Sequence, residues 1–202
     1  MQGWRLVGAA SVILVAVQAA LLGLTGTEEA GLRTAVRASA RVSFAIFLCV
    51  YLAAPVHRLW PSRASRWLLR NRRYVGVSFA VAHGLHAVDI GLLALLLGDA
   101  FRIDPVVFYG GGLAYVLLAA MVLTSFDRSA DWLGPRRWKA LHRAGIHYLW
   151  FIFALDWTPL AFQKPAYLPL ALASWTALGL RVAAWRARRG AGAIAPAPAR
   201  AS

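Results

Sequence analysis

The sequence predicts an all-α protein, a polytopic bundle of about six transmembrane helices. Of its 202 residues, 60% are apolar and only 15% are charged, and the mean hydropathy is +0.58. Apolar segments recur along the chain with about 20 residues each, the length that a helix needs to cross a hydrocarbon core of about 30 Å. Short basic segments separate them. This alternation is typical of a membrane protein and not of a soluble domain.

Six segments have the required length and composition. They are roughly Arg5 to Leu24, Val42 to Trp60, Tyr74 to Gly98, Pro105 to Phe126, Trp138 to Trp157 and Tyr167 to Trp185. The first segment begins with an arginine and ends in small residues, which is also the pattern of a signal peptide. Its apolar run is longer than a typical signal-peptide core, and no clear A-x-A cleavage site follows. We therefore expect a retained span.

The positions of Lys and Arg predict the orientation. Residues 57–73 and 127–143 are rich in basic side chains: Arg58, Arg63, Arg66, Arg70, Arg72 and Arg73 in the first, and Arg128, Arg136, Arg137, Lys139 and Arg143 in the second. We expect both segments in the cytoplasm, and an even number of spans then places both termini there too. Arg33, Arg37 and Arg41, before the second span, do not fit this rule.

Charge and cysteine content exclude several classes of protein. The net charge is +14, but the basic residues alternate with apolar runs instead of covering a polar surface, so no nucleic-acid partner is expected. A single cysteine, Cys49, allows neither a disulfide framework nor a thiolate metal site. Gly110, Gly111 and Gly112 follow no strand and indicate close helix packing instead of a dinucleotide site. We therefore expect no NAD or flavin domain.

The chain divides into three parts by composition. Residues 1–40 contain the first transmembrane helix and a following loop, residues 41–189 form the main helical domain, and residues 190–202 form a flexible Ala/Pro tail.

Four of the five histidines lie in two predicted spans. His83 and His86 are three residues apart and share a helix face, whereas His142 and His147 are five apart and lie about 140° from each other. Polar residues at membrane depth face the bundle interior, and imidazole is a common axial ligand of haem iron. The alternative is a role in interhelical hydrogen bonding. Zinc is disfavoured, because no carboxylate or thiolate completes a four-ligand set.

Depth within the membrane gives a first prediction of how the histidines pair. Counted inward from the arginines before each span, His83 and His86 are ten and thirteen residues deep, and His142 and His147 are five and ten deep. Helix rise therefore pairs His83 or His86 with His147 better than with His142.

Several short motifs occur in a characteristic order between Arg41 and Trp157. They are Ala54-Pro55 at the end of the second span, Arg72-Arg73-Tyr74-Val75-Gly76 at the start of the third, His86 ten residues after that glycine, Thr124-Ser125 at the end of the fourth, and Trp138-Lys139-Ala140-Leu141-His142-Arg143 at the start of the fifth. In these motifs the chain resembles the ferric reductase-like transmembrane domain family, and within it the MsrQ-type haem-binding subunits of the methionine-sulfoxide-reducing system.

The resemblance implies a noncovalent haem b with His86 and His142 as axial iron ligands, and leaves His83 and His147 as further cofactor-binding candidates. The sequence agrees with noncovalent binding, because it contains no C-x-x-C-H attachment motif. Family members usually carry one more histidine, thirteen residues after the one in the WxxLH motif, where this chain has Leu155. We identify no catalytic residue.

Three other residues are candidates for a supporting role. Asp89, three residues after His86, is expected either to orient an imidazole or assist proton uptake, or simply to pair with a buried arginine or hydroxyl. Arg72 and Arg73 are expected either to pair with haem propionates or to act only as topology determinants.

The resemblance implies a function in electron transfer. The chain is expected to be a haem-binding subunit of an oxidoreductase that passes single electrons across the cell inner (cytoplasmic) membrane to a partner oxidoreductase or to ferric iron. The donor would be a flavin-bearing reductase or a quinol, with FMN or quinone as the donor cofactor. The alternative from a different class is a haem-free integral membrane scaffold, assembly factor or transporter, although no convincing internal repeat supports a transporter.

Overall fold

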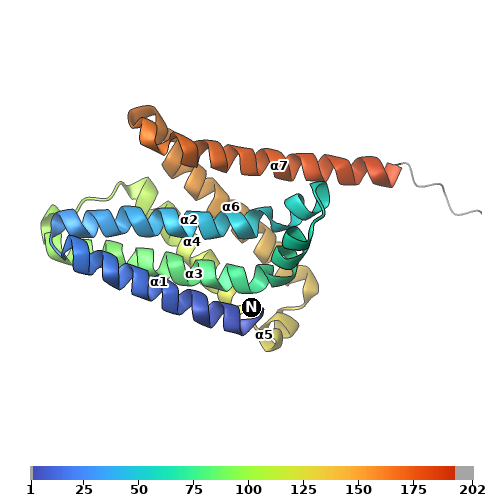
Figure 1. Cartoon of the computed structure of the whole chain (residues 1–202), viewed down its shortest axis with the longest axis horizontal. Coiled ribbons are helices and arrows are strands. Elements are labelled where there is room, and N and C mark those ends of the chain that lie inside the picture. The colour runs from blue at the N-terminus through green and yellow to red at the C-terminus, as the bar shows by residue number, and fades with distance from the viewer. Residues whose placement is uncertain (1, 194–202) are drawn as a thin grey trace, which may run out of the picture.

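A computed structural model describes residues 2–193, which fold into helices joined by short connections (Figure 1). The elements are α1 (Trp4–Thr25), α2 (Glu29–Leu59), α3 (Arg63–Leu97), η1 (Gly98–Ala100), α4 (Pro105–Leu123), α5 (Asp127–Leu133), α6 (Pro135–Gln163), η2 (Pro165–Tyr167) and α7 (Leu168–Ala193). These residues contain no strand, and the predicted all-α fold is confirmed.

Within residues 2–193, five helical segments are long and apolar enough to cross a membrane: α1, α2, α3, α4 and the segment of η2 and α7. The prediction of a polytopic membrane bundle is therefore confirmed. The sixth predicted span lies in α6, which has 29 residues. At 1.5 Å per residue α6 is about 43 Å long, enough to span. Its first half carries Arg136, Arg137 and Lys139, which lower its hydropathy, and Figure 1 shows it running from α5 to the opposite end of the bundle.

Two helices continue beyond their predicted spans. α2 begins at Glu29, where the Arg33 side chain pairs with the Glu29 carboxylate at 2.7 Å, one helical turn away. α3 begins after Ser62, whose side chain forms a capping box with Ser65. Residues 29–40, predicted as a loop, are therefore helical, and position 40 lies within α2. Of the predicted tail, residues 190–193 belong to α7, and residues 194–202 lie outside the described part.

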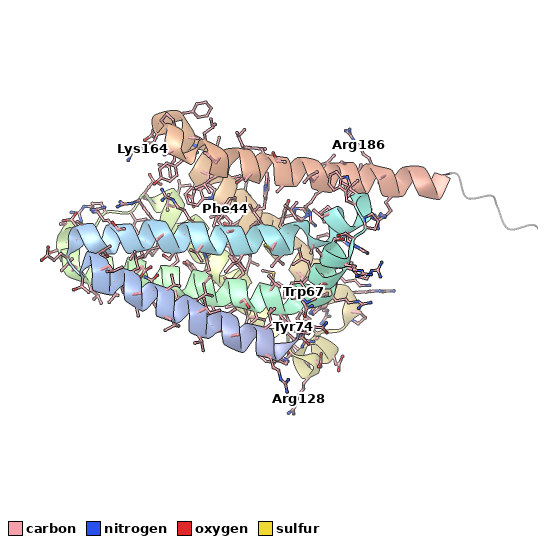
Figure 2. All side chains as sticks on the ribbon, viewed as in Figure 1. Phe44, Trp67, Tyr74, Arg128, Lys164 and Arg186 are labelled. Carbon is pink, nitrogen blue, oxygen red and sulfur yellow. The ribbon has the colours of Figure 1, made fainter. Side chains whose placement is uncertain are left out.

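The connections gather the basic residues at one end of the bundle. Figure 1 shows the start of α1, the α2–α3 connection, α5 and the last turns of α7 at the same end. This end, which contains residues 57–73 and 127–143, is called the basic end below. Figure 2 shows Lys164 at the other end, beside the α6–α7 connection. There the Arg41 guanidinium lies 5.2 Å from the centre of the Tyr167 ring.

Aromatic rings fill the centre of the bundle between α2, α3 and α6. Phe47 lies 5.4 Å from Phe79 and 5.1 Å from Phe153, measured between ring centroids, and Phe44 lies 5.1 Å from Phe153. Because lipid is as apolar as these side chains, close packing rather than exclusion of water holds such helices together. α1 packs against α2 and α3 from outside and has no buried residue, as expected for a helix that faces lipid.

The turn between α1 and α2 depends on a close approach at Gly31. A Cβ at this position would overlap the carbonyl oxygens of Thr25 and Gly26, which are backbone atoms and cannot rotate away. We expect Gly31→Ala to destabilise the α1–α2 hairpin by about 1–3 kcal/mol, the usual cost of overpacking. Thermal unfolding in detergent measures this. Gly23→Ala is the control, because a Cβ there meets nothing within 4 Å; equal unfolding temperatures for the two variants would refute the prediction.

Candidate functional site

A cavity of about 310 Å³ lies at the basic end, between α2, α3, α4, α6 and α7. Its inner walls are apolar and include Phe47, Phe79, Leu118 and Leu149. Its size is at the lower end of the range of about 300–1,000 Å³ that is usual for ligand sites. The cavity therefore has room for a ligand with an apolar body.

The cavity has a strongly positive lining. Five cationic side chains contribute to it and no carboxylate does: Arg72, Arg73, Lys139, Arg143 and Arg181. Arg73 donates from Nη1 to the exposed Asp127 at 2.7 Å, but its Nε is buried without a hydrogen-bond partner. A buried donor without an acceptor is costly, so the lining favours an anionic ligand that supplies one.

His142 lies in the wall of this cavity and is held there by the first residue of its motif. Trp138, one turn earlier in α6, stacks on the His142 ring at 4.1 Å and donates its Nε1–H to the Thr124 carbonyl at 2.8 Å. The Thr124 hydroxyl donates to the Ala120 carbonyl at 2.7 Å and lies 3.1 Å from His142 Nε2. Since a hydroxyl has one proton, Thr124 accepts from the imidazole. The motifs at the ends of α4 and α6 thus form one local unit.

His83 and His86 lie deeper in the bundle and outside the cavity lining. The Ser43 hydroxyl donates to the Ala40 carbonyl at 3.0 Å, so its lone pair accepts from His83 Nδ1–H at 3.2 Å. Ser39 Oγ is in turn 3.2 Å from His86 Nδ1 and 2.7 Å from an Asp89 oxygen. In both imidazoles Nδ1 carries the proton, which leaves the Nε2 lone pair available to a metal.

Asp89 joins three helices at this depth. It is 1% exposed, accepts from Gln18 Nε2 of α1 at 2.6 Å and from Ser39 Oγ of α2 at 2.7 Å, and reaches His86 through Ser39. Asp89 was expected either to orient an imidazole or to pair with a buried arginine or hydroxyl. In the structure it pairs with the Ser39 hydroxyl, which in turn contacts the His86 imidazole. No ion pair of Asp89 occurs in residues 2–193.

His142 and the α3 histidines lie at different levels of the bundle. The His83 ring lies 4.7 Å from the Tyr115 ring of α4 and 5.6 Å from the Phe153 ring of α6. Tyr115 precedes Thr124, the hydrogen-bond partner of His142 at the end of α4, by nine residues. Phe153 follows His142 by eleven residues. At 1.5 Å per residue, the two separations are about 14 Å and about 17 Å. Imidazoles that share one metal are each about 2 Å from it. His83, and His86 one turn further on, are therefore too far from His142 for one metal ion to bind either of them together with His142.

His147 does not itself line the cavity, and the contacts of its ring are with Tyr51 and not with the α3 histidines. Its Nδ1 lies 3.3 Å from the Tyr51 hydroxyl of α2. The pairing expected from depth, with His83 or His86, is therefore not seen. Within the described residues, no group of three or more His, Cys, Asp or Glu side chains is arranged to hold a metal ion.

Neither Arg181 as a residue of the cavity nor Trp138 as a partner of the His142 ring was identified from the sequence. Arg181 lies inside an apolar segment, five residues before the basic residues Arg186, Arg188 and Arg189, and this isolated position is a signal that could have found it. Trp138 is four residues from His142, a spacing that predicts contact on a helix.

The fold and the cavity define a class: a polytopic helical membrane protein with a cationic cavity, lined by one imidazole, at one end. The chain is 32% identical over 145 residues to the "Protein-methionine-sulfoxide reductase heme-binding subunit MsrQ" of Cronobacter sakazakii. The matched region covers 65% of this chain and 70% of that relative. It is 30% identical over 146 residues to the protein of the same name from Salmonella paratyphi B, with 65% and 71% covered. The protein of the same name from Azospira oryzae is 33% identical to this chain over 103 residues, which are 43% of this chain and 42% of that relative.

The chain therefore belongs to the MsrQ family of haem-binding subunits, and the resemblance noted from its motifs is confirmed. No family model matches the sequence, and no solved structure matches it.

Proposed function

We propose that this chain is the membrane-embedded, haem b-binding electron-transfer subunit of a protein-methionine-sulfoxide reductase. The observation that carries the proposal is the cavity at the basic end, with His142 in its wall and only cations among its charged lining residues. Membership in a family whose relatives are named as haem-binding subunits supports the same function.

The residues of the cavity fit haem b. The porphyrin is apolar, as are the cavity walls at Phe47 and Phe79, and its two propionates match the cationic lining. The buried Arg73 Nε is a donor that a propionate oxygen would satisfy. When bound, haem iron alternates between the ferric and ferrous states and so carries one electron at a time. The protein contributes ligation, burial and charge.

His142 is the proposed axial ligand in the cavity. Its Nε2–H is donated to the Thr124 hydroxyl here, so ligation through Nε2 requires that this hydrogen bond be given up. Trp138, stacked on the ring, limits how far the imidazole moves. Arg72 and Arg73 are the proposed partners of one propionate.

His86 is the proposed ligand of a second, deeper haem. The family resemblance supports its role as a ligand, and the distance from His142 favours a separate iron. Its Nδ1 proton is held by Ser39, which leaves Nε2 for the metal. Two haems in series would divide the crossing of the membrane into two shorter electron transfers. His83 lies one turn from His86 and is the neighbouring candidate.

The proposed location is the cytoplasmic membrane, with the basic end and both termini in the cytoplasm. A flavin-bearing reductase or a quinol would then deliver electrons at the basic end. A periplasmic oxidoreductase, or ferric iron, would accept them at the other end.

The spectrum of the purified protein tests this function. From haem-replete cells we expect a reduced-minus-oxidised difference spectrum of b-type haem and a pyridine haemochrome of noncovalent haem. A haem-free scaffold or transporter would be colourless. A correctly folded, colourless preparation that also binds no added haemin would refute the proposal.

The orientation is tested with reporter fusions. We expect a fusion after Ser65, in the first turn of α3, and a fusion at the C-terminus both to report cytoplasm, because Arg and Lys near short connections are retained there. A fusion between α3 and α4, after Arg102, is the control that should report periplasm. A periplasmic C-terminus would mean that α6 does not span.

A further inference from the structure

Pro55 leaves one backbone carbonyl of α2 without its helical partner. In an α-helix the N–H of each residue donates to the carbonyl four residues earlier, and proline has no N–H. Pro55 lies inside α2, so the Tyr51 carbonyl loses its donor. Within a membrane such a carbonyl must find a donor from a neighbouring helix.

Arg181 of α7 supplies that donor. Its Nη1 lies 2.7 Å from the Tyr51 carbonyl oxygen, and its guanidinium lies 4.3 Å from the centre of the Tyr51 ring. The Tyr51 side chain is fully buried, stacks on Phe47 at 5.3 Å and contacts His147 through its hydroxyl. The guanidinium is therefore fixed in position by a rigid neighbour.

Arg181 is also part of the cavity lining. A guanidinium has five N–H donors in one plane, and the Tyr51 carbonyl uses one Nη group, which leaves others for a ligand. Arg72 and Arg73 reach the cavity from α3, whereas Arg181 reaches it from α7. Lys139 and Arg143 reach it from α6, so the cations of the lining come from three helices, and among the described residues no carboxylate lines the cavity to balance them.

We propose that Arg181 is a carboxylate-binding subsite of the cavity, held in place by the carbonyl that Pro55 frees. The ligand class is a flat apolar molecule with two carboxylates, one for Arg72 and Arg73 and one for Arg181. This rests on the proposed function, in which haem b with its two propionates occupies the cavity. Arginine suits this role better than lysine, because its fork can bond the Tyr51 carbonyl and a carboxylate together.

The test compares haemin with haemin dimethyl ester, which has the same iron and macrocycle but no free carboxylates. Full-length apoprotein in detergent is titrated with each, and the ratio of the two dissociation constants is measured. We expect the wild type to bind haemin more tightly than the ester. In Arg181→Met this preference should fall about tenfold, because a hydrogen bond to a charged group contributes at least a factor of ten to a dissociation constant. Binding of the ester should change little.

The matched control is Arg186→Met, which removes a cation from the same helix. Arg186 is exposed and points away from the bundle in Figure 2, and it does not line the cavity. Its haemin-to-ester ratio should equal that of the wild type. Equal loss in both variants would mean that general charge, and not a subsite, determines the preference.

Pro55→Ala tests independently whether the freed Tyr51 carbonyl positions Arg181. If Arg181→Met does not fold, this variant alone tests the carboxylate-binding subsite. An alanine N–H would compete with Arg181 for the Tyr51 carbonyl, so the preference for haemin should fall although every cation remains. If the ratio is unchanged in both Arg181→Met and Pro55→Ala, or in Pro55→Ala alone when the first does not fold, the subsite is overturned. If neither porphyrin binds the wild type, it is the proposed function that fails.

Discussion

His142→Ala is expected to remove the haem of the cavity. The substitution takes away the only imidazole in the cavity lining and leaves Trp138 and the Thr124 hydroxyl without the ring that they contact. Loss of an outer-shell partner typically costs 10–100-fold in metal affinity, so loss of the ligand itself should cost more than about 100-fold. The measurement is haem retained per chain after purification, together with the affinity for added haemin.

His147→Ala is the matched control for this experiment. It removes an imidazole from the same helix, five residues further on, but one that contacts Tyr51 and does not itself line the cavity. We expect it to keep most of its haem. If His147→Ala strips the haem and His142→Ala leaves the spectrum unchanged, the assignment of the cavity as the haem site is wrong.

His86→Ala is expected to halve the haem content and to leave the haem at His142 in place. The expectation follows from the two levels of the histidines, which differ by about 14 Å or more along the helix axes. A single haem bridged by both histidines would instead be lost entirely in either variant. Pyridine haemochrome measures the ratio of haem to protein, and a redox titration shows whether one of two components has disappeared.

A second variant separates loss of a ligand from loss of structure. Ser39→Ala keeps the His86 imidazole but removes the hydroxyl that holds its Nδ1 proton and joins it to Asp89. We expect haem to remain and its midpoint potential to shift upward, because the ligand becomes less basic. If Ser39→Ala leaves the potential of every haem component unchanged, the Ser39 hydroxyl does not tune a haem ligand.

The start of a span was predictable from sequence where a local signal marks it. α4 begins at Pro105, directly after Asp104, whose side chain accepts from the Val106 N–H at 2.8 Å, and the predicted start is the observed one. The starts of α2 and α3 were not predictable in the same way. Their first turns are rich in arginine and leave the apolar region, so hydropathy gives no signal there, although arginine favours helix.

The candidate site was predictable to the extent that it is local. Trp138 and His142 are one turn apart, and their motif identified the histidine that lines the cavity. The contacts of Tyr51 with His147 and with Arg181 join residues 96 and 130 positions apart. Such contacts depend on how α2, α6 and α7 pack, which no spacing within one helix reveals.

The polar first half of α6 has a consequence for biogenesis. A basic residue near the centre of a lone membrane helix costs about 2.5–3.5 kcal/mol on insertion, and α6 carries two histidines and several cations in its first half. We expect α6 to leave the translocon only together with neighbours that shield it, among them α7, which is synthesised after it. Since α7 also supplies Arg181, the cavity is complete only after α7 has been made. A ligand of the cavity should therefore bind only after α7 has packed against the other helices.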